Sequence, residues 1–348
     1  MTLVAGVLVL GEPGRPTEAR PLRAWAPRNS PVAATSAPPQ VAALKRLREP
    51  HLLVVADRSL PMAVIERVRR WKDVDSAEIV DAAQAAFDGR KVGTIGVNPS
   101  TFRAYTPKPT AASDDLWRRV AGGEMAVSFS LGTDGGLALG KRVESHGQAI
   151  RVGAHATMGL DAVDAVVSRS MARALGFPQN NALLVSAPKV DSAKMRDALR
   201  KVLPRGTQVV VLKPAFSPSH RQQVPAGRVN VALTAAASKL GAPYVWGAEG
   251  PDAFDCSGLI QWAFAQAGVR LPRVTHQQFA SGSLVPFSEM RPGDLIFWRL
   301  DPTNPGYISH AAIYWGDGKM IQAPRTGDVV RIVPVHTRNL AGVVRVSN

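Results

Sequence analysis

Short continuous apolar runs and helically spaced apolar patterns alternate along residues 41–214. The continuous runs predict strands at residues 50–58, 91–98, 124–136, 148–156 and 207–213. Apolar positions three or four residues apart predict helices at residues 61–71, 159–177 and 191–206. Residues 73–87 fit either a strand or a helix. This alternation predicts an α/β or α+β domain over residues 41–214.

The segment 159–177 shows the clearest helical spacing in this domain. Its apolar stripe consists of Val163, Val166, Val167, Met171 and Leu175. Gly176 follows the stripe, where a glycine commonly ends a helix. We therefore expect one amphipathic helix over the whole segment.

Composition shifts divide the chain into four parts. Residues 1–40 are rich in Pro, Ala, Ser and Arg and predict a flexible N-terminal segment. Its start, MTLVAGVLVLG, fits either the apolar half of a secretory signal or a short buried strand. Pro and Ser recur again in residues 215–229, which predict a linker between 41–214 and a second domain at 230–348.

Charge and hydropathy narrow the class of protein. The 348 residues carry 42 Lys+Arg and 27 Asp+Glu, a formal net charge of +15, which favours polyanionic partners. The basic residues are scattered, and no helix-turn-helix, zinc-finger or aromatic-interleaved basic pattern supports a nucleic acid partner. The sequence contains no apolar run of 18 residues, so no integral membrane span is predicted.

The chain contains a single cysteine, Cys256, which excludes an internal disulfide and a cysteine-rich zinc or iron–sulfur site. Residues 255–272 predict a helix whose apolar face includes Cys256, and Asp255 stands where an N-cap belongs. Free backbone N–H groups at a helix start stabilise a thiolate, so we expect a lowered Cys256 pKa. The alternative is a buried, inert cysteine.

A nucleophilic cysteine needs a base, and His310 is the best candidate. The stretch HAAIYWGDGKMIQ predicts a hairpin with its turn at 316–318, which brings His310 close to Gln322. Gln322 can orient the imidazole as the third member of a triad. His276 and His336 are alternative bases.

Several motifs together resemble one family. PYVWGAEGPDAFDCSGLIQWAFAQAGVRLPR, MRPGDLIFW and SHAAIYWGDGKMIQAP are similar to the NlpC-type cysteine peptidases of bacterial cell walls. The resemblance implies a papain-like α+β domain, with a cysteine-bearing helix packed on an antiparallel sheet, preceded by the separate α/β or α+β domain.

The resemblance also implies roles for individual residues. It makes Cys256 the nucleophile, His310 the base and Gln322 the third polar member. The remaining matches are Tyr244, which lines the site near the oxyanion, Asp255 and Ser257, which help to bind the substrate, and Asp294, which is structural.

The implied reaction is hydrolysis of an amide bond in a peptidoglycan stem peptide, between D-glutamate and a diamino acid. It requires no metal and no organic cofactor, and it implies a secreted or envelope-associated protein. Two alternatives remain: a non-catalytic wall-binding or scaffold protein with a degenerate site, and a papain-like amidase or acyltransferase acting on another substrate. The bond, the diamino acid and the oligomeric state are not specified by the sequence.

The first domain carries no recognisable catalytic motif. Its phrase KVGTIGVNPSTFRAYTP is similar to the extracytoplasmic core of MacB- and FtsX-type permeases. That likeness implies an interaction domain that faces the envelope, and an envelope protein as a partner of residues 41–214.

Overall fold

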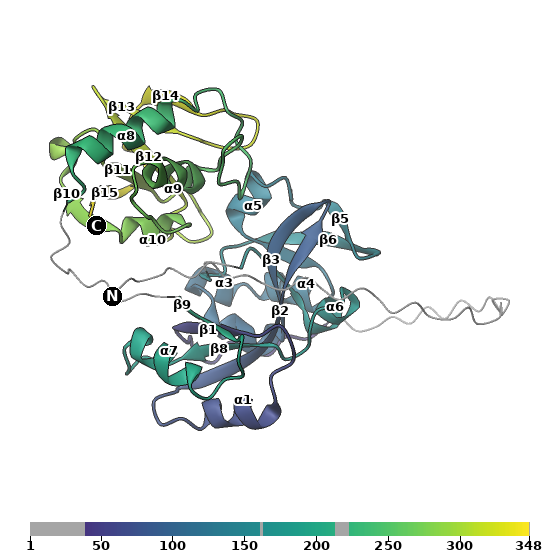
Figure 1. The fold of residues 1–348 in the computed structure, drawn as a ribbon. Coiled ribbons are helices and arrows are strands. Elements are labelled where there is room, and N and C mark those ends of the chain that lie inside the picture. Colours follow the sequence, from purple (N-terminus) through teal and green to yellow (C-terminus); the bar gives the residue numbers. More distant parts are fainter. Residues whose placement is uncertain (1–38, 161–162, 213–222, 348) are drawn as a thin grey trace.

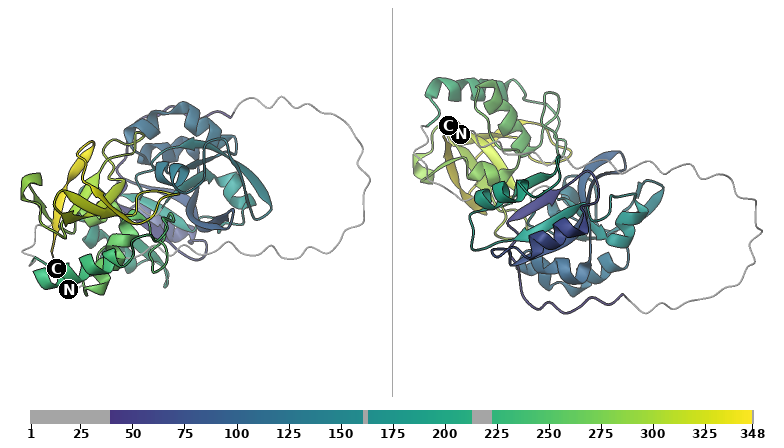
Figure 2. Two further views of the ribbon diagram at one scale, coloured as in Figure 1. Left: turned by 90° about the horizontal axis from the view of Figure 1, so that it is seen from above. Right: turned by 60° about the horizontal axis from the view of Figure 1, so that its bottom comes forward.

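The computed structural model describes residues 39–160, 163–212 and 223–347, which form two lobes (Figures 1 and 2). The lobes are a sheet-rich N-terminal domain and a C-terminal domain with its own sheet. Nearly all of the predicted N-terminal segment 1–40, including the possible signal, lies outside the described residues. So does the first half of the predicted linker 215–229.

Nine strands of the described chain form one mixed sheet in the first domain, in the order β5-β6-β4-β7-β3-β2-β8-β1-β9. The strands are β1 (Leu52–Val55), β2 (Ser76–Phe87), β3 (Arg90–Val97), β4 (Met125–Val127), β5 (Arg142–Ser145), β6 (Gln148–His155), β7 (Ala165–Ser168), β8 (Ala182–Ser186) and β9 (Gln208–Val211). Residues 73–87, which fitted either a strand or a helix, are therefore mostly strand. Parallel pairs join β3 to β7 and β4 to β6, and the other neighbours are antiparallel.

Helices cover both faces of this sheet. They are α1 (Met62–Arg69), α2 (Pro99–Phe102), α3 (Lys108–Ala112), α4 (Asp114–Ala121), α5 (Phe129–Thr133), α6 (Arg169–Ala174) and α7 (Ser192–Arg200), with a 3₁₀ turn, η1 (Arg103–Tyr105). Helices α1 and α7 pack on one face of β1 and β8, where Leu52 and Leu183 point. Helix α4 lies on the opposite face, over β4, β6 and β7, and belongs to the same apolar cluster as Leu53 and Leu184. Because neighbouring strand residues point to opposite faces, these continuous apolar runs belong to strands buried on both sides.

The predicted helix over residues 159–177 is wrong in its first half. Ala165–Ser168 form strand β7, and only Arg169–Ala174 are helical. The four β7 residues are all buried, because β7 lies between β3 and β4 and is covered on both faces. Helix α6 lies so close to β3 that a Cβ on Gly96 would come 2.2 Å from the Ala172 Cβ.

The predicted strand over residues 124–136 is also only partly correct. Met125–Val127 form β4, and Phe129–Thr133 then form the short helix α5. Ser128 ends the strand by capping the helix, since its hydroxyl accepts a hydrogen bond from the Leu131 N–H at 3.3 Å. In the ribbon, α5 lies at the junction of the two domains (Figure 1).

In the C-terminal domain, six strands form an antiparallel sheet in the order β10-β15-β11-β12-β13-β14. The strands are β10 (Gly282–Val285), β11 (Leu295–Trp298), β12 (His310–Gly316), β13 (Lys319–Gln322), β14 (Arg331–Pro334) and β15 (Leu340–Val346). The helices are α8 (Ala226–Ala237), α9 (Cys256–Gln266) and α10 (Thr275–Phe279), with a 3₁₀ turn, η2 (Phe287–Glu289). Helix α8 begins inside the predicted linker, so the second domain starts earlier than the composition indicated.

Helix α9 packs on this sheet through one apolar face, as predicted. Leu259, Ala263 and Phe264 are fully buried in the same cluster as Ala311 of β12 and Leu295 of β11. The hairpin predicted at residues 316–318 joins β12 to β13. This packing places the first turn of α9 beside the start of β12.

The two domains touch through polar and apolar contacts. The Thr157 hydroxyl of the first domain donates a hydrogen bond to the Asp301 carboxylate of the second. The Thr157 N–H donates to the Thr303 hydroxyl at 3.1 Å. Trp246 of the second domain packs against the first-domain apolar cluster that contains Phe87 and Leu131.

Candidate active site

The sequence folds Cys256 into the first turn of α9 by means of its neighbour Asp255. Asp255 is the N-cap, and its Oδ1 accepts a hydrogen bond from the Gly258 N–H at 2.7 Å, as predicted. The other oxygen, Oδ2, accepts from the Gly247 N–H at 3.0 Å. Position 258 must be glycine, since a Cβ there would lie 2.1 Å from the Ala248 carbonyl oxygen. The loop that precedes α9 therefore folds tightly over the helix start.

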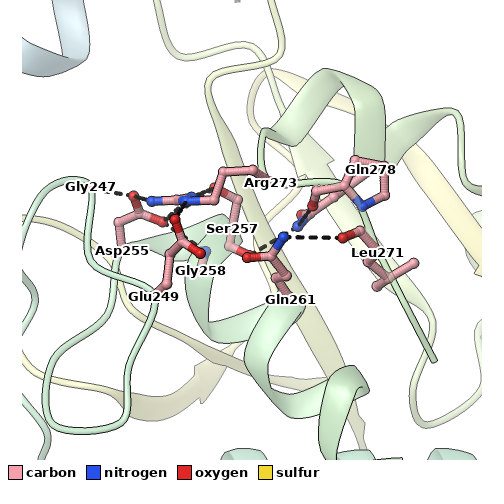
Figure 3. A network of polar contacts seen from close by, with 10 residues as sticks. Gly247, Glu249, Asp255, Ser257, Gly258, Gln261, Leu271, Arg273 and Gln278 are labelled. Atoms are coloured by element: carbon pink, nitrogen blue, oxygen red, sulfur yellow. Dashed lines mark hydrogen bonds and ion pairs between the residues drawn. The ribbon is translucent and has the colours of Figure 1, made fainter. Parts of the chain in front are cut away.

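Arg273 completes the surroundings of this helix start (Figure 3). Its Nη1 and Nη2 donate to the two Asp255 oxygens at 3.0 and 2.5 Å, a bidentate ion pair. Nη1 also donates to the Ser257 hydroxyl at 2.8 Å, and Nε lies 3.0 Å from Glu249 Oε1. Arg273 has no sequence signal for this role, because it lies beyond the end of α9 and reaches Asp255 only when the chain turns back.

Gln278 is a second supporting residue that the sequence analysis missed. Its side chain is fully buried, and Nε2 donates to the carbonyl oxygens of Ser257 and Pro272 at 2.9 and 2.8 Å (Figure 3). Gln278 thus joins the first turn of α9 to the segment that carries Arg273. A buried glutamine in a polar stretch such as VTHQQ has no local signal that would reveal this role.

His310 begins β12 and Gln322 ends β13, so the hairpin brings the two side chains together as predicted. Nε2 of His310 lies 2.7 Å from Oε1 of Gln322. Because an amide oxygen only accepts, the ring donates from Nε2, and Nδ1 keeps its lone pair. Burial lowers the pKa of His310 from its usual 6.5, against the opposing effect of the Gln322 hydrogen bond.

The expected lowering of the Cys256 pKa is wrong. Burial of the side chain raises the pKa of Cys256 to about 12, and the nearby Asp255 carboxylate acts in the same direction. The Ala311 backbone N–H, the Arg273 cation and the Ser257 backbone N–H act in the opposite direction, but their effects are weaker. A sequence shows the helix start, but not how deeply the sulfur is buried.

Cys256 and His310 line one cleft of about 340 Å³. Tyr244 lines it as well and is buried beside Cys256, and burial raises the pKa of its hydroxyl. Ser257 and Asp255 also line the cleft, and both Asp255 oxygens accept hydrogen bonds from Arg273 and from backbone N–H groups. The structure therefore brings all six predicted site residues into one region.

The two alternative bases do not line the cleft. The ring of His276, on α10, contacts that of Tyr307 at a centroid distance of 5.7 Å. The exposed His336 contacts the Trp298 ring at 5.0 Å. Among the described residues, His310 is the histidine that lines the cleft with Cys256.

Asp294 is structural, as expected. Its carboxylate is buried and pairs with the Arg345 guanidinium at 2.8 and 2.9 Å, which ties the start of β11 to β15. Within the described residues, no three His, Cys, Asp or Glu side chains gather in a way that could hold a metal ion. No helix in the described part of the chain is both long and apolar enough to span a bilayer.

The fold and the clustered cysteine and histidine define the class of the second domain. The model of the NlpC/P60 family matches residues 241–344. The C-terminal domain is therefore an NlpC/P60 domain, as the sequence motifs indicated.

Curated relatives share this domain. A Mycobacterium tuberculosis protein named as a probable endopeptidase is 43% identical over 103 residues, which are 30% of this chain and 25% of the relative. The peptidoglycan endopeptidase RipA of the same species is 38% identical over 120 residues, 31% of this chain and 24% of RipA. This chain thus spans about a quarter of the length of these relatives.

A solved structure of the resuscitation promoting factor interacting protein RipA is also similar. It has 33% sequence identity and a TM-score of 0.33, and the match covers 37% of this chain and 68% of that one. The family match begins at residue 241, so the first domain lies outside it. The likeness of residues 41–214 to MacB- and FtsX-type permeases, and an envelope protein partner for them, stay predictions.

Proposed function

We propose that this chain hydrolyses amide bonds in the stem peptides of peptidoglycan and acts at the bacterial cell envelope. One observation carries the proposal: Cys256 and His310 line a single cleft, with the imidazole oriented by Gln322. The named activity of the relative RipA supports peptidoglycan as the substrate.

In the proposed mechanism, Nδ1 of His310 removes the Cys256 proton as the sulfur attacks the peptide carbonyl. A thiol with a raised pKa and an imidazole with a lowered pKa form a neutral pair at rest. Charge therefore separates only during attack, and the Ala311 and Ser257 N–H groups stabilise the thiolate as it forms. Backbone N–H groups at the start of α9 then stabilise the carbonyl oxyanion.

The tetrahedral intermediate collapses when protonated Nδ1 donates its proton to the leaving amine. The amide C–N bond breaks and a thioester to Cys256 remains. Water then attacks the thioester, Nδ1 accepts its proton, and the carboxylic acid leaves as the thiol is restored. Each proton passes through His310, so the mechanism needs no metal and no organic cofactor.

The proposed scissile bond lies between D-glutamate and the diamino acid. Tyr244 and Ser257 line the cleft beside Cys256 and are proposed to contact the substrate. For Asp255 we propose a positioning role instead, because its oxygens are engaged by Arg273, Gly247 and Gly258.

The test is mass spectrometry of muropeptides incubated with the purified full chain. We expect new fragments ending in D-glutamate, and none with Cys256→Ala or His310→Ala. His146→Asn is the control, since this exposed histidine lies in the turn between β5 and β6 of the first domain. Cleavage retained by Cys256→Ala would overturn the mechanism.

Failure of the wild-type chain to cleave would favour one of the alternatives. Retention of peptidoglycan by the protein without cleavage would indicate a wall-binding or scaffold role. Hydrolysis or acyl transfer on other amides would indicate a different papain-like activity.

A further inference from the structure

The cleft that holds Cys256 is bounded by both domains. Residues of the first domain make up a large part of its wall, among them Gln84, Lys91, Phe129, Thr133, Asp134 and Asp164. Most of these positions lie on β2, β3 and α5, or directly after α5. The first domain, which has no catalytic motif of its own, therefore faces the nucleophile.

This wall is held in place by the contacts between the domains. The buried Asp301 carboxylate accepts hydrogen bonds from the Thr157 hydroxyl and from the Thr303 N–H, the latter at 2.7 Å. Trp246, which lines the cleft, packs against apolar clusters of both domains. A polar contact at Asp301 and an apolar contact at Trp246 therefore hold the first domain against the cleft.

Asp134 is the residue of this wall whose chemistry stands out. It follows α5 directly, and its N–H donates to the Ser130 carbonyl oxygen at 2.7 Å, which fixes its backbone. Its carboxylate acts electrostatically on Tyr244, and Arg325 of the second domain acts on it in turn. Burial raises the pKa of Asp134, and it outweighs the opposite effects of a hydrogen bond from the Thr133 side chain and of the more distant Arg325.

The other carboxylates of the cleft are held by partners from other segments of the chain, whereas Asp134 is held by its neighbour Thr133. Asp255 is paired with Arg273 and caps α9. Asp164 accepts a hydrogen bond from the Ser128 hydroxyl at 3.0 Å. A desolvated carboxylate that lacks a close cation is stabilised by a cationic ligand, because the ion pair offsets its burial.

We propose that the first domain forms one wall of the substrate site and that Asp134 binds an ammonium group of the substrate. This inference rests on the proposed peptidase function. It adds that the substrate carries a positively charged amine that the enzyme recognises. A stem peptide offers such a group in two places, a free N-terminal amine and the side-chain amine of the diamino acid. Asp134 is then a specificity determinant contributed by the first domain.

The test measures peptide binding to the full chain carrying Cys256→Ala, by calorimetry, so that no turnover occurs. The probes are one synthetic stem peptide, its N-terminally acetylated form and its side-chain-acetylated form. We expect one of the two acetylations to weaken binding about tenfold or more, which corresponds to about 1.4 kcal/mol. The affected form identifies which amine Asp134 binds.

The same three peptides are then bound to the double variant with Asp134→Asn. We expect the unmodified peptide to bind about tenfold more weakly, with no further loss upon acetylation of that amine. Asp115→Asn is the control, since Asp115 is an exposed partner of Arg119 on α4. Unchanged thermal unfolding of Asp134→Asn shows that the variant is folded.

Two results would overturn the role of Asp134 without affecting the proposed peptidase function. They are unchanged binding to Asp134→Asn, and equal loss upon acetylation with and without the Asp134 carboxylate. Failure of the proposed function has a different signature: the wild-type chain neither binds nor hydrolyses the unmodified peptide.

Discussion

Nε2 of His310 lies 2.7 Å from Oε1 of Gln322, across the hairpin that joins β12 to β13. Because Gln322 is neutral, it accepts the ring hydrogen bond without supplying a negative charge that would favour imidazolium. Burial therefore dominates the titration of His310 and lowers its pKa. Gln322 orients the ring, and burial lowers the pH at which His310, the proposed base, becomes protonated.

The first prediction concerns the pH profile of kcat/KM. In the proposed mechanism neutral imidazole accepts the thiol proton, so we expect activity to be lost as the pH falls through the His310 pKa. Since that pKa is lowered, we expect the acid limb below pH 6.5. Because the Cys256 pKa is raised to about 12, activity should stay level from neutral into alkaline pH. Steady-state kinetics on a soluble stem peptide measure both limbs.

A different profile would point to a different resting state. An increase in kcat/KM with a pKa near that of a free thiol, about 8.5, would mean that thiolate is the reactive form. The neutral pair would then be wrong, although the nucleophile would be the same.

The second prediction separates the two effects of Gln322. Gln322→Ala removes the acceptor that orients the ring, and we expect kcat to fall about 10- to 100-fold. Gln322→Glu keeps an acceptor and adds a charge that stabilises imidazolium, so the His310 pKa rises and the acid limb moves to higher pH.

The control for this pair is Gln266→Glu, which adds the same charge at the exposed end of α9. It should leave the acid limb in place. An acid limb unchanged in Gln322→Glu would show that the ring does not sense position 322.

The third prediction concerns stability. Arg273→Ala leaves the buried Asp255 carboxylate without its cation, and breaking a buried pair costs about 3–5 kcal/mol. We expect a loss of that size in the free energy of unfolding of the C-terminal domain, measured by denaturant titration. Arg331→Ala removes an exposed pair with Asp328 and should cost less than about 1 kcal/mol. Equal losses in the two variants would contradict a structural role for the Arg273 pair.

The fourth prediction tests the contact between the domains. Thr157→Val removes the hydroxyl that donates to Asp301 while keeping the side-chain shape. We expect a broader distance distribution in solution scattering, because the domains are less tightly held. We also expect the free energy of unfolding to fall by about 1.5–3 kcal/mol, because a hydrogen bond to a charged carboxylate is lost. Thr101→Val is the matched control, since its hydroxyl also donates to a carboxylate, that of Glu78, but within the first domain. Identical scattering from both variants would contradict the role of Thr157.

The sequence predicted those parts of the site that depend on local pattern. Helical spacing and a capping aspartate place Cys256 at the start of α9, and one hairpin turn fixes the pairing of His310 with Gln322. Both relations are short in sequence, so periodicity and turn chemistry are enough to predict them. The family motifs then supplied the roles.

The sequence-based predictions were wrong or incomplete where the structure depends on contacts between segments that are distant in sequence. Ala165–Ser168 have helical spacing, but the sheet places them between β3 and β4, and pairing with those strands overrides the local pattern. The Cys256 pKa depends on how deeply Sγ is buried, which is a property of the packed domain. Asp134 enters the cleft only because the two domains are docked.

The double use of Asp255 has a practical consequence for trapping experiments. Its carboxylate caps the nucleophile helix and also neutralises buried Arg273, so any replacement disturbs folding and chemistry together. An inactive protein made at this position would be a poor substrate trap, because lost binding and lost structure would look alike. Cys256→Ala removes only the sulfur of the proposed nucleophile, and we expect it to leave a protein suited to capturing a complex.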